Sequence, residues 1–237
     1  MKNFSLNHKK TGVIFLSFGI FGSFVVVMYM IMWSNFKYHA ANQISGINYL
    51  AYFTFLANIL LFVWLILAGI AILTNKQAVK KNLFAPKIFC GIALYVILVG
   101  IIFYGALRWM VTPFPWNLWY ARLSDFFFHG LSPIMTILLF VYMKKTAGDN
   151  KEKIRLRHVT FWLIFPLLYF AFSLIRGFII DWFAYPFFDP NWDFAYALPI
   201  PSWLYIILIT ILFSALFYLA GFFVMKIWNY SKITSKY

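Results

Sequence analysis

Six apolar stretches, each long enough to cross a bilayer as a helix, constrain this chain more than any other feature. A transmembrane helix needs about 20 mainly apolar residues. Lipid offers no partners to backbone N–H and C=O groups, so each spanning stretch must satisfy them within a helix. We therefore predict an all-α integral membrane bundle of six transmembrane helices, forming one domain over residues 1–237. The predicted helices cover residues 11–33, 48–74, 86–110, 120–143, 159–180 and 201–226.

The composition agrees with a membrane protein and excludes an ordinary water-soluble domain. Hydrophobic residues make up 64% of the chain and charged residues 11%, against roughly 45–50% and about 25% in soluble domains. The stretch 11–33 is too long for the apolar core of a signal peptide and lacks a small-residue cleavage site, so we expect it to stay as an uncleaved helix.

The distribution of Lys and Arg predicts the orientation. With these helices, sixteen of the twenty Lys and Arg residues fall on one side of the membrane and three on the other. Cytoplasmic loops carry the excess of Lys and Arg, so both termini are expected in the cytoplasm of a multi-pass cell-membrane protein. The net charge of +14 lies in short runs beside apolar stretches. We expect these runs to contact anionic lipid headgroups rather than nucleic acid.

The fourth stretch carries a polar face. Its members are three or four residues apart and so share one side of a helix: Arg122, Asp125, His129, Ser132 and Thr136. Ionisable side chains at membrane depth are functional candidates. Asp125 can hold one imidazole nitrogen of His129 and leave the other free to act as a base. Pro133 removes the usual helical partner of the His129 carbonyl and predicts a kink there. The alternative is an Asp125–Arg176 ion pair, with His129 only satisfying a polar core.

The second stretch adds a possible nucleophile. Thr54 and Asn58 are four residues apart. A rise of 1.5 Å per residue puts Thr54 roughly 9 Å and His129 roughly 13 Å below the outer surface, close enough for their side chains to meet. Thr54 would then be the nucleophile and His129 its base. The alternative is that Thr54 bonds its own backbone or a neighbouring helix, as Thr commonly does in membrane helices.

The fifth stretch and the loop after it hold further candidates. Tyr169 and Arg176 lie on one stripe, and Arg176 can bind a substrate carboxylate through two parallel hydrogen bonds. Together with Asn58 they are the candidate substrate-binding residues. The loop 181–200 is acidic, aromatic and free of Lys and Arg, which predicts a compact external cap or re-entrant segment. No His, Cys or acidic cluster has metal-ligand spacing and no phosphate or dinucleotide motif occurs, so we expect no metal and no cofactor.

Four segments resemble known families. YFTFLANIL (Tyr52 to Leu60) and HGLSPI (His129 to Ile134) resemble the androgen-induced protein family, whose eukaryotic members are six-helix membrane threonine hydrolases of fatty-acid esters of hydroxy fatty acids. That resemblance implies a Thr nucleophile at Thr54 and a catalytic His at His129. FPLLYFAFSLIRG (Phe165 to Gly177) and YPFFDP (Tyr185 to Pro190) resemble a bacterial six-helix family of unassigned function. The second resemblance implies the fold and a bacterial plasma membrane, but no activity.

Three functions remain open at this level. The first is a membrane-embedded hydrolase of lipid esters, in which Thr54, His129 and Asp125 act on a lipid or lipid-like substrate. The second is a small transporter with an Asp125, His129 and Arg176 relay, against which stands the lack of an internal repeat. The third is a non-catalytic lipid-binding or assembly protein.

Overall fold

The computed structural model describes residues 8–35, 46–110, 119–148, 152–191 and 200–230, and within these ranges the secondary structure is helical without a strand. The α-helices are α1 (His8–Asn35), α2 (Phe53–Leu73), α3 (Gln77–Leu83), α4 (Pro86–Ile102), α5 (Arg108–Met110), α6 (Trp119–Asp125), α7 (Ser132–Ala147), α8 (Leu156–Trp162), α9 (Ile164–Ile180) and α11 (Ser202–Asn229). Two short 3₁₀ helices, η2 (Gly46–Ala51) and η5 (Pro186–Phe188), and two π-helical turns, η3 (Phe103–Leu107) and η4 (Phe126–Leu131), complete the described elements.

Six helical stretches are long and apolar enough to cross a membrane, as the sequence predicts. They are Lys9–Met32, Phe53–Leu73, Pro86–Leu107, Arg122–Ala147, Leu156–Ile180 and Ser202–Asn229. The second of them begins at Phe53 rather than at residue 48. The residues before it form the separate 3₁₀ helix η2, which ends at Ala51. The other boundaries differ from the predicted ones by four residues or fewer, as expected for frayed helix ends.

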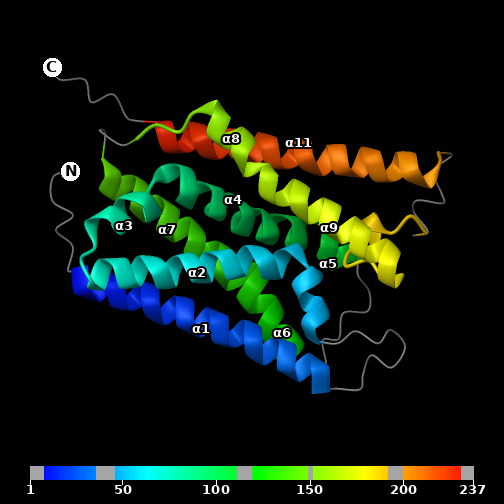
Figure 1. Ribbon diagram of the computed structural model, residues 1–237, viewed down its shortest axis with the longest axis horizontal. Coiled ribbons are helices and arrows are strands. Elements are labelled where there is room, and N and C mark those ends of the chain that lie inside the picture. Colours follow the sequence, from blue (N-terminus) through cyan, green and yellow to red (C-terminus); the bar gives the residue numbers. More distant parts are fainter. Residues whose placement is uncertain (1–7, 36–45, 111–118, 149–151, 192–199, 231–237) are drawn as a thin grey trace.

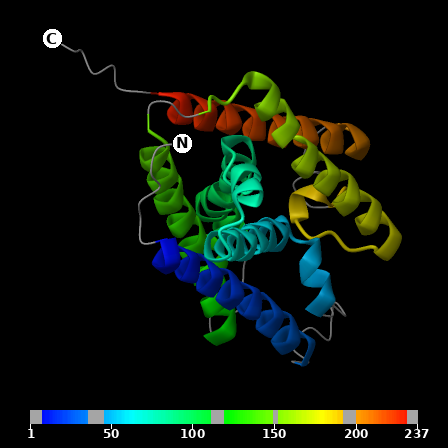
Figure 2. The same ribbon diagram turned by 60° about the vertical axis from the view of Figure 1, so that its left-hand side comes forward.

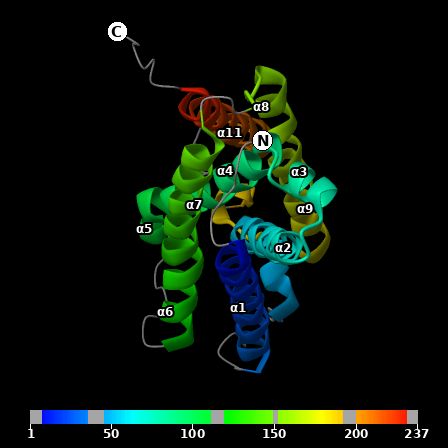
Figure 3. The ribbon, with the colours of Figure 1, turned by 90° about the vertical axis from the view of Figure 1, so that its left-hand side faces the viewer.

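Helix α4 lies at the centre of the bundle, between α2, α7 and α11 (Figures 1, 2 and 3). Its span is also the most buried of the six, at 61%, whereas the span of α11 is 11% buried. Helix α1 packs along α2. A Cβ atom on Gly19 would lie 2.9 Å from the Phe62 carbonyl oxygen, and one on Gly69 would lie 2.8 Å from the Leu16 nitrogen. The absence of side chains at these two glycines therefore allows close backbone approach, as small residues do between membrane helices.

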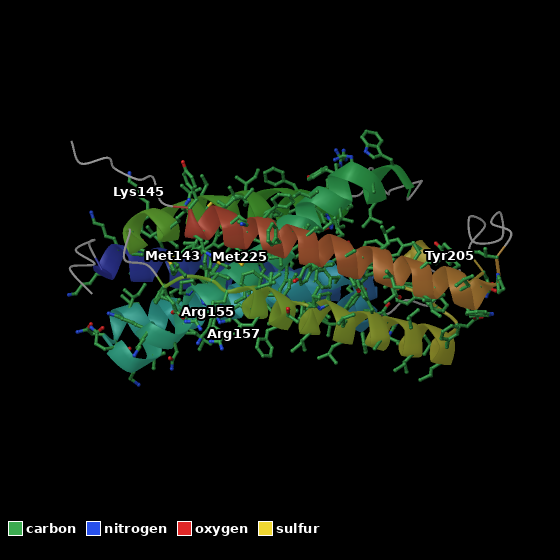
Figure 4. All side chains as sticks on the ribbon, turned by 90° about the horizontal axis from the view of Figure 1, so that it is seen from above. Met143, Lys145, Arg155, Arg157, Tyr205 and Met225 are labelled. Atoms are coloured by element: carbon green, nitrogen blue, oxygen red, sulfur yellow. The ribbon has the colours of Figure 1, made fainter. Side chains whose placement is uncertain are left out.

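The two ends of the bundle differ in charge. Helix α1 begins and α11 ends at the same end of the bundle (Figure 1). Lys145, Arg155 and Arg157 lie towards that end, and Tyr205 lies near the opposite one (Figure 4). Tryptophan indoles tie the charged end together by donating to carbonyls of neighbouring segments. These bonds run from Trp64 to Leu83 (2.9 Å), from Trp162 to Lys87 (2.7 Å) and from Trp228 to Glu152 (3.0 Å).

Three of the spans contain backbone irregularities: the third ends in the π turn η3, and in the fifth and fourth the irregularity lies beside a proline. In the fifth span, Pro166 provides no N–H for the carbonyl of Trp162, and the helix is interrupted at Leu163 between α8 and α9. The Tyr95 hydroxyl of α4 donates to that carbonyl at 2.7 Å and so replaces the missing bond. In the fourth span, the irregularity expected from Pro133 takes the form of the π-helical turn η4, which contains His129.

The described part of the loop after α9 folds onto the bundle. Tyr185, Phe187 and Phe188 are all buried there, and Phe188 has no exposed surface. This agrees with a compact segment for residues 181–191. The remainder of the predicted loop, residues 192–199, lies outside the described residues.

Candidate functional site

Thr54 and His129 lie together where the second and fourth spans meet. Thr54 is the second residue of α2, and His129 lies in the turn η4 between α6 and α7. The Thr54 Oγ1 and His129 Nε2 atoms are 3.3 Å apart. Both side chains are largely shielded, with 7% exposure for the Thr54 residue and 16% for the His129 side chain. The two groups, which were predicted to lie at depths close enough for their side chains to meet, are therefore direct neighbours.

Asp125 completes a chain of three groups. It ends α6, is 5% exposed, and places Oδ1 3.1 Å from Nδ1 of His129. An ionised carboxylate only accepts hydrogen bonds, so Nδ1 of the imidazole carries the proton and donates it to Asp125. In the neutral ring Nε2 is then an acceptor, and the Thr54 hydroxyl donates to it. Hydroxyl, imidazole and carboxylate thus stand in the order found in nucleophile–base–orienter triads.

The π-helical turn explains how His129 reaches Thr54. A π turn inserts one residue into the helical repeat, and such insertions recur at functional sites. The two π turns among the described residues meet here, because Phe103 of η3 stacks on the His129 ring with centroids 3.6 Å apart and planes 6° from parallel. Phe103 therefore holds the imidazole plane from the side of the central helix.

Asn58 ties the two elements of the site together. It is fully buried, and its Nδ2 donates to the Thr54 carbonyl at 2.8 Å and to the Phe128 carbonyl at 3.4 Å. One bond lies within α2 and the other reaches the turn η4 just before His129. The Oδ1 atom of Asn58 has no hydrogen-bond partner among the described residues. Asn58 therefore links the first turn of α2 to the turn on which His129 lies.

Asp125 has a cationic neighbour that the sequence did not single out. Arg108 at the start of α5 places NH1 3.9 Å from Asp125 Oδ2, and its guanidinium lies 5.4 Å from the centre of the Tyr104 ring. Arg108 therefore faces one carboxylate oxygen of Asp125, Oδ2, while His129 contacts the other, Oδ1.

Arg176 lies in a different environment from the one that the ion-pair alternative requires. Its NH2 donates to Asn48 Oδ1 of η2 at 2.5 Å, and its guanidinium lies 4.9 Å from the centre of the Trp182 ring. The carboxylate of Asp125 contacts Arg108 and His129 instead. The Asp125–Arg176 pair is thus replaced by two separate contacts, because α9 lies on the other side of α2 from α6 (Figure 3).

A small cavity of about 30 Å³ lies beside Thr54. Its polar wall consists of Thr54, Tyr169 and Tyr185, and the rest is apolar and mainly phenylalanine. A volume of this size holds roughly one or two water molecules, or a group as small as a carbonyl. His129 and Asp125 do not line it, so Thr54 stands between the imidazole and the cavity. The hydroxyl of Tyr169 donates to the Ala51 carbonyl at 2.8 Å.

The other residues of the predicted polar face differ in their burial. Ser132 and Thr136 are buried on the same side of the fourth span, and Thr136 Oγ1 donates to the Ser132 carbonyl at 2.7 Å. Arg122 is exposed instead. The π turn between Arg122 and Ser132 shifts the helical phase, so that residues before it do not continue the face of the residues after it.

Sequence analysis did not single out Tyr185, Phe103 or Arg108 as site residues. Tyr185 belongs to the aromatic loop that was interpreted only as a cap or re-entrant segment, and Arg108 entered only the overall distribution of Lys and Arg. Phe103 is one of 30 phenylalanines and carries no distinguishing signal. Comparison of the chain with known protein families, with curated proteins and with solved structures found no match.

Proposed function

We propose that this protein is a membrane-embedded hydrolase of lipid esters, in which Thr54 is the nucleophile, His129 the base and Asp125 the group that orients His129. The observation that carries the proposal is the continuous chain from Thr54 Oγ1 to His129 Nε2 at 3.3 Å and from His129 Nδ1 to Asp125 Oδ1 at 3.1 Å. A buried chain of this kind is costly in lipid unless it has a use, which favours a reactive role over a packing role.

The surroundings of Thr54 support the same proposal. Other threonines of the bundle donate to the carbonyl four residues earlier in their own helix, among them Thr136, Thr160 and Thr210. Thr54 lies in the first turn of α2 and faces an imidazole instead. The apolar cavity beside it suits an ester carbonyl whose chains lie in the hydrophobic phase.

The reaction proceeds in two balanced steps. First, Thr54 Oγ1 attacks the ester carbonyl carbon while its proton passes to His129 Nε2, and the carbonyl oxygen takes the electron pair. The intermediate collapses, the ester C–O bond breaks, and the leaving alcohol takes the proton from His129. A water molecule then attacks the acyl carbon of acyl-Thr54 while its proton passes to His129. The acyl C–Oγ1 bond breaks, Thr54 Oγ1 takes the proton back from His129, and the acid is released.

The test is hydrolysis of p-nitrophenyl esters of long-chain fatty acids by the purified protein in detergent micelles and in nanodiscs. Thr54→Ala and His129→Ala are each expected to abolish turnover while the variants keep the wild-type melting temperature. Thr210→Ala is the matched control, because its hydroxyl bonds only its own helix. Full turnover in folded Thr54→Ala would remove the proposal, and mass spectrometry of an acylated Thr54 peptide would support it directly.

The proposal includes an orientation in which both termini face the cytoplasm and Thr54 lies in the outer half of a bacterial plasma membrane. The Lys and Arg distribution supports it. A membrane-impermeant maleimide applied to intact cells tests it in a Cys90→Ala background, since Cys90 is the sole cysteine. Trp203→Cys, at the start of α11, is expected to react, and Lys145→Cys, near the end of α7, to stay unlabelled. The reverse pattern would invert the orientation.

In this orientation Arg176 is the proposed site for a substrate carboxylate. It lies in the outer half of the fifth span, and Phe172, Ile175 and Ile179 flank it along an open groove. Asn48 and Trp182 hold the guanidinium in place. A substrate with an ester carbonyl at Thr54 and a free carboxylate at Arg176 would use both.

A further inference from the structure

Tyr185 lines the cavity beside Thr54. It belongs to the loop after α9, immediately before η5, and is 9% exposed. No role has been given to this loop so far. The ring of Tyr185 is stacked on Phe187 with centroids 5.1 Å apart and planes 11° from parallel, and it meets the edge of Tyr52 at 5.4 Å and 88°. The ring is therefore held on two sides, which fixes the position of its hydroxyl.

Tyr185 and the nucleophile Thr54 line the same small cavity. The first turn of α2, at Phe53 and Thr54, lies close enough to the Tyr185 hydroxyl to affect its pKa. The single proton of the Thr54 hydroxyl is directed at His129. It is therefore not available to an oxygen in the cavity. Burial raises the pKa of Tyr185, and this outweighs the opposite effect of the nearby Thr54 and Phe53. Tyr185 consequently keeps its proton at neutral pH and remains able to donate it.

The other polar groups of the cavity are already engaged. Of the three polar side chains in its wall, Tyr169 donates to the Ala51 carbonyl at 2.8 Å, and Thr54 is the attacking group. The remaining lining side chains are apolar. A negative charge formed on an ester oxygen in this space would therefore find one side-chain donor, Tyr185. The N-terminus of α2 brings the positive end of the helix dipole to the same place.

We propose that the Tyr185 hydroxyl donates a hydrogen bond to the oxyanion that forms when Thr54 attacks an ester carbonyl. An ester entering the cavity brings its carbonyl oxygen beside Thr54, where it can accept a hydrogen bond from Tyr185. The bond strengthens as charge develops on that oxygen, so that Tyr185 lowers the barrier rather than improving ground-state binding. This inference deepens the proposed function and rests on it.

The experiment compares Tyr185→Phe with the wild type in hydrolysis of p-nitrophenyl esters of long-chain fatty acids. Phenylalanine keeps the stacking on Phe187 and removes only the hydroxyl. Loss of one oxyanion donor typically lowers kcat about 10²–10³-fold, and KM is expected to stay unchanged. The matched control is Tyr95→Phe, since Tyr95 is also a buried tyrosine, on α4, whose hydroxyl donates to a backbone carbonyl. It is expected to keep the wild-type kcat.

A second variant separates the hydroxyl from folding. Replacement of Tyr185 by 3-fluorotyrosine keeps the donor and is expected to retain kcat, and thermal unfolding reports whether each protein is folded. Unchanged kcat in folded Tyr185→Phe, or a raised KM with unchanged kcat, would overturn the oxyanion role while leaving Thr54 and His129 in place. Absence of turnover in the wild type would overturn the proposed function, and this inference with it.

Discussion

Gly100 is the point at which the central helix α4 comes against the turn that carries His129. A Cβ atom at this position would lie 2.9 Å from Pro133 Cγ and 3.0 Å from the His129 carbonyl oxygen. Carbon atoms in favourable contact are about 3.5–4.0 Å apart. Gly100→Ala therefore forces α4 and the turn η4 apart by about 0.5–1 Å. Because His129 stands on that turn, the substitution also lengthens its contact with Thr54.

The matched control is Gly105→Ala, on the turn η3 that follows α4. A Cβ atom there would meet nothing within 4 Å. Both substitutions gain about 0.5–1 kcal/mol of helix propensity, so the difference between them isolates the clash. Overpacking of this kind costs about 1–3 kcal/mol. At about 2–4 °C per kcal/mol, Gly100→Ala should melt about 2–12 °C below Gly105→Ala.

The effect on turnover should be larger than the effect on stability. A misplacement of about 1 Å in a catalytic group can cost about 10²-fold in rate. We expect Gly100→Ala to lose ester hydrolysis by up to about this factor, with Gly105→Ala unaffected. Thermal unfolding in detergent and initial rates on a p-nitrophenyl ester measure the two effects. Equal melting temperatures and equal rates in both variants would refute the packing on which the site depends.

Three further substitutions give separate tests. Asp125→Asn should lower kcat about 10⁴-fold with little change in KM, since the amide lets the imidazole take the wrong tautomer; a loss below tenfold would contradict the orienting role. Arg176→Ala should raise KM about 10–100-fold for an ester that carries a free carboxylate, because a hydrogen bond to a charged group contributes about 1.5–3 kcal/mol. The KM for a neutral ester should not change. An equal effect on both esters would count against carboxylate binding. Asn58→Ala should lower the free energy of unfolding by about 1–3 kcal/mol, since the Thr54 and Phe128 carbonyls lose the hydrogen bonds donated by the Asn58 side chain. An unchanged melting temperature would contradict this.

The pairing of Thr54 with His129 was predictable in part. Distance along each apolar stretch gives the depth of a side chain in the membrane, because a helix rises by a constant 1.5 Å per residue. The spacing of Asp125 and His129 likewise follows from the helical repeat, which places residues four apart on one face. Depth and face do not reveal which helices are neighbours. For this reason the sequence allowed an Asp125–Arg176 ion pair, whereas in the structure Asp125 lies 3.9 Å from Arg108 and Arg176 bonds Asn48.

The polar face of the fourth span shows where a regular helix is a poor guide. With ideal geometry Arg122 would share a side with Ser132 and Thr136, yet Arg122 is exposed and the other two are buried. The inserted residue of the turn η4 rotates everything before it relative to everything after it. Pro133 signals an irregularity at this place, but it does not tell a kink from a π turn.

The six helices that are long and apolar enough to cross a membrane were determined by the sequence alone, because the transfer of a residue into lipid depends on its own side chain and adds up along a stretch. The cavity beside Thr54, the stacking of Phe103 on His129 and the arrival of Tyr185 from a distant loop were decided only by the tertiary structure. These contacts depend on how each helix is rotated and which helix lies next to it. Rotation and neighbourhood follow from the packing of all the helices together, which no single stretch encodes.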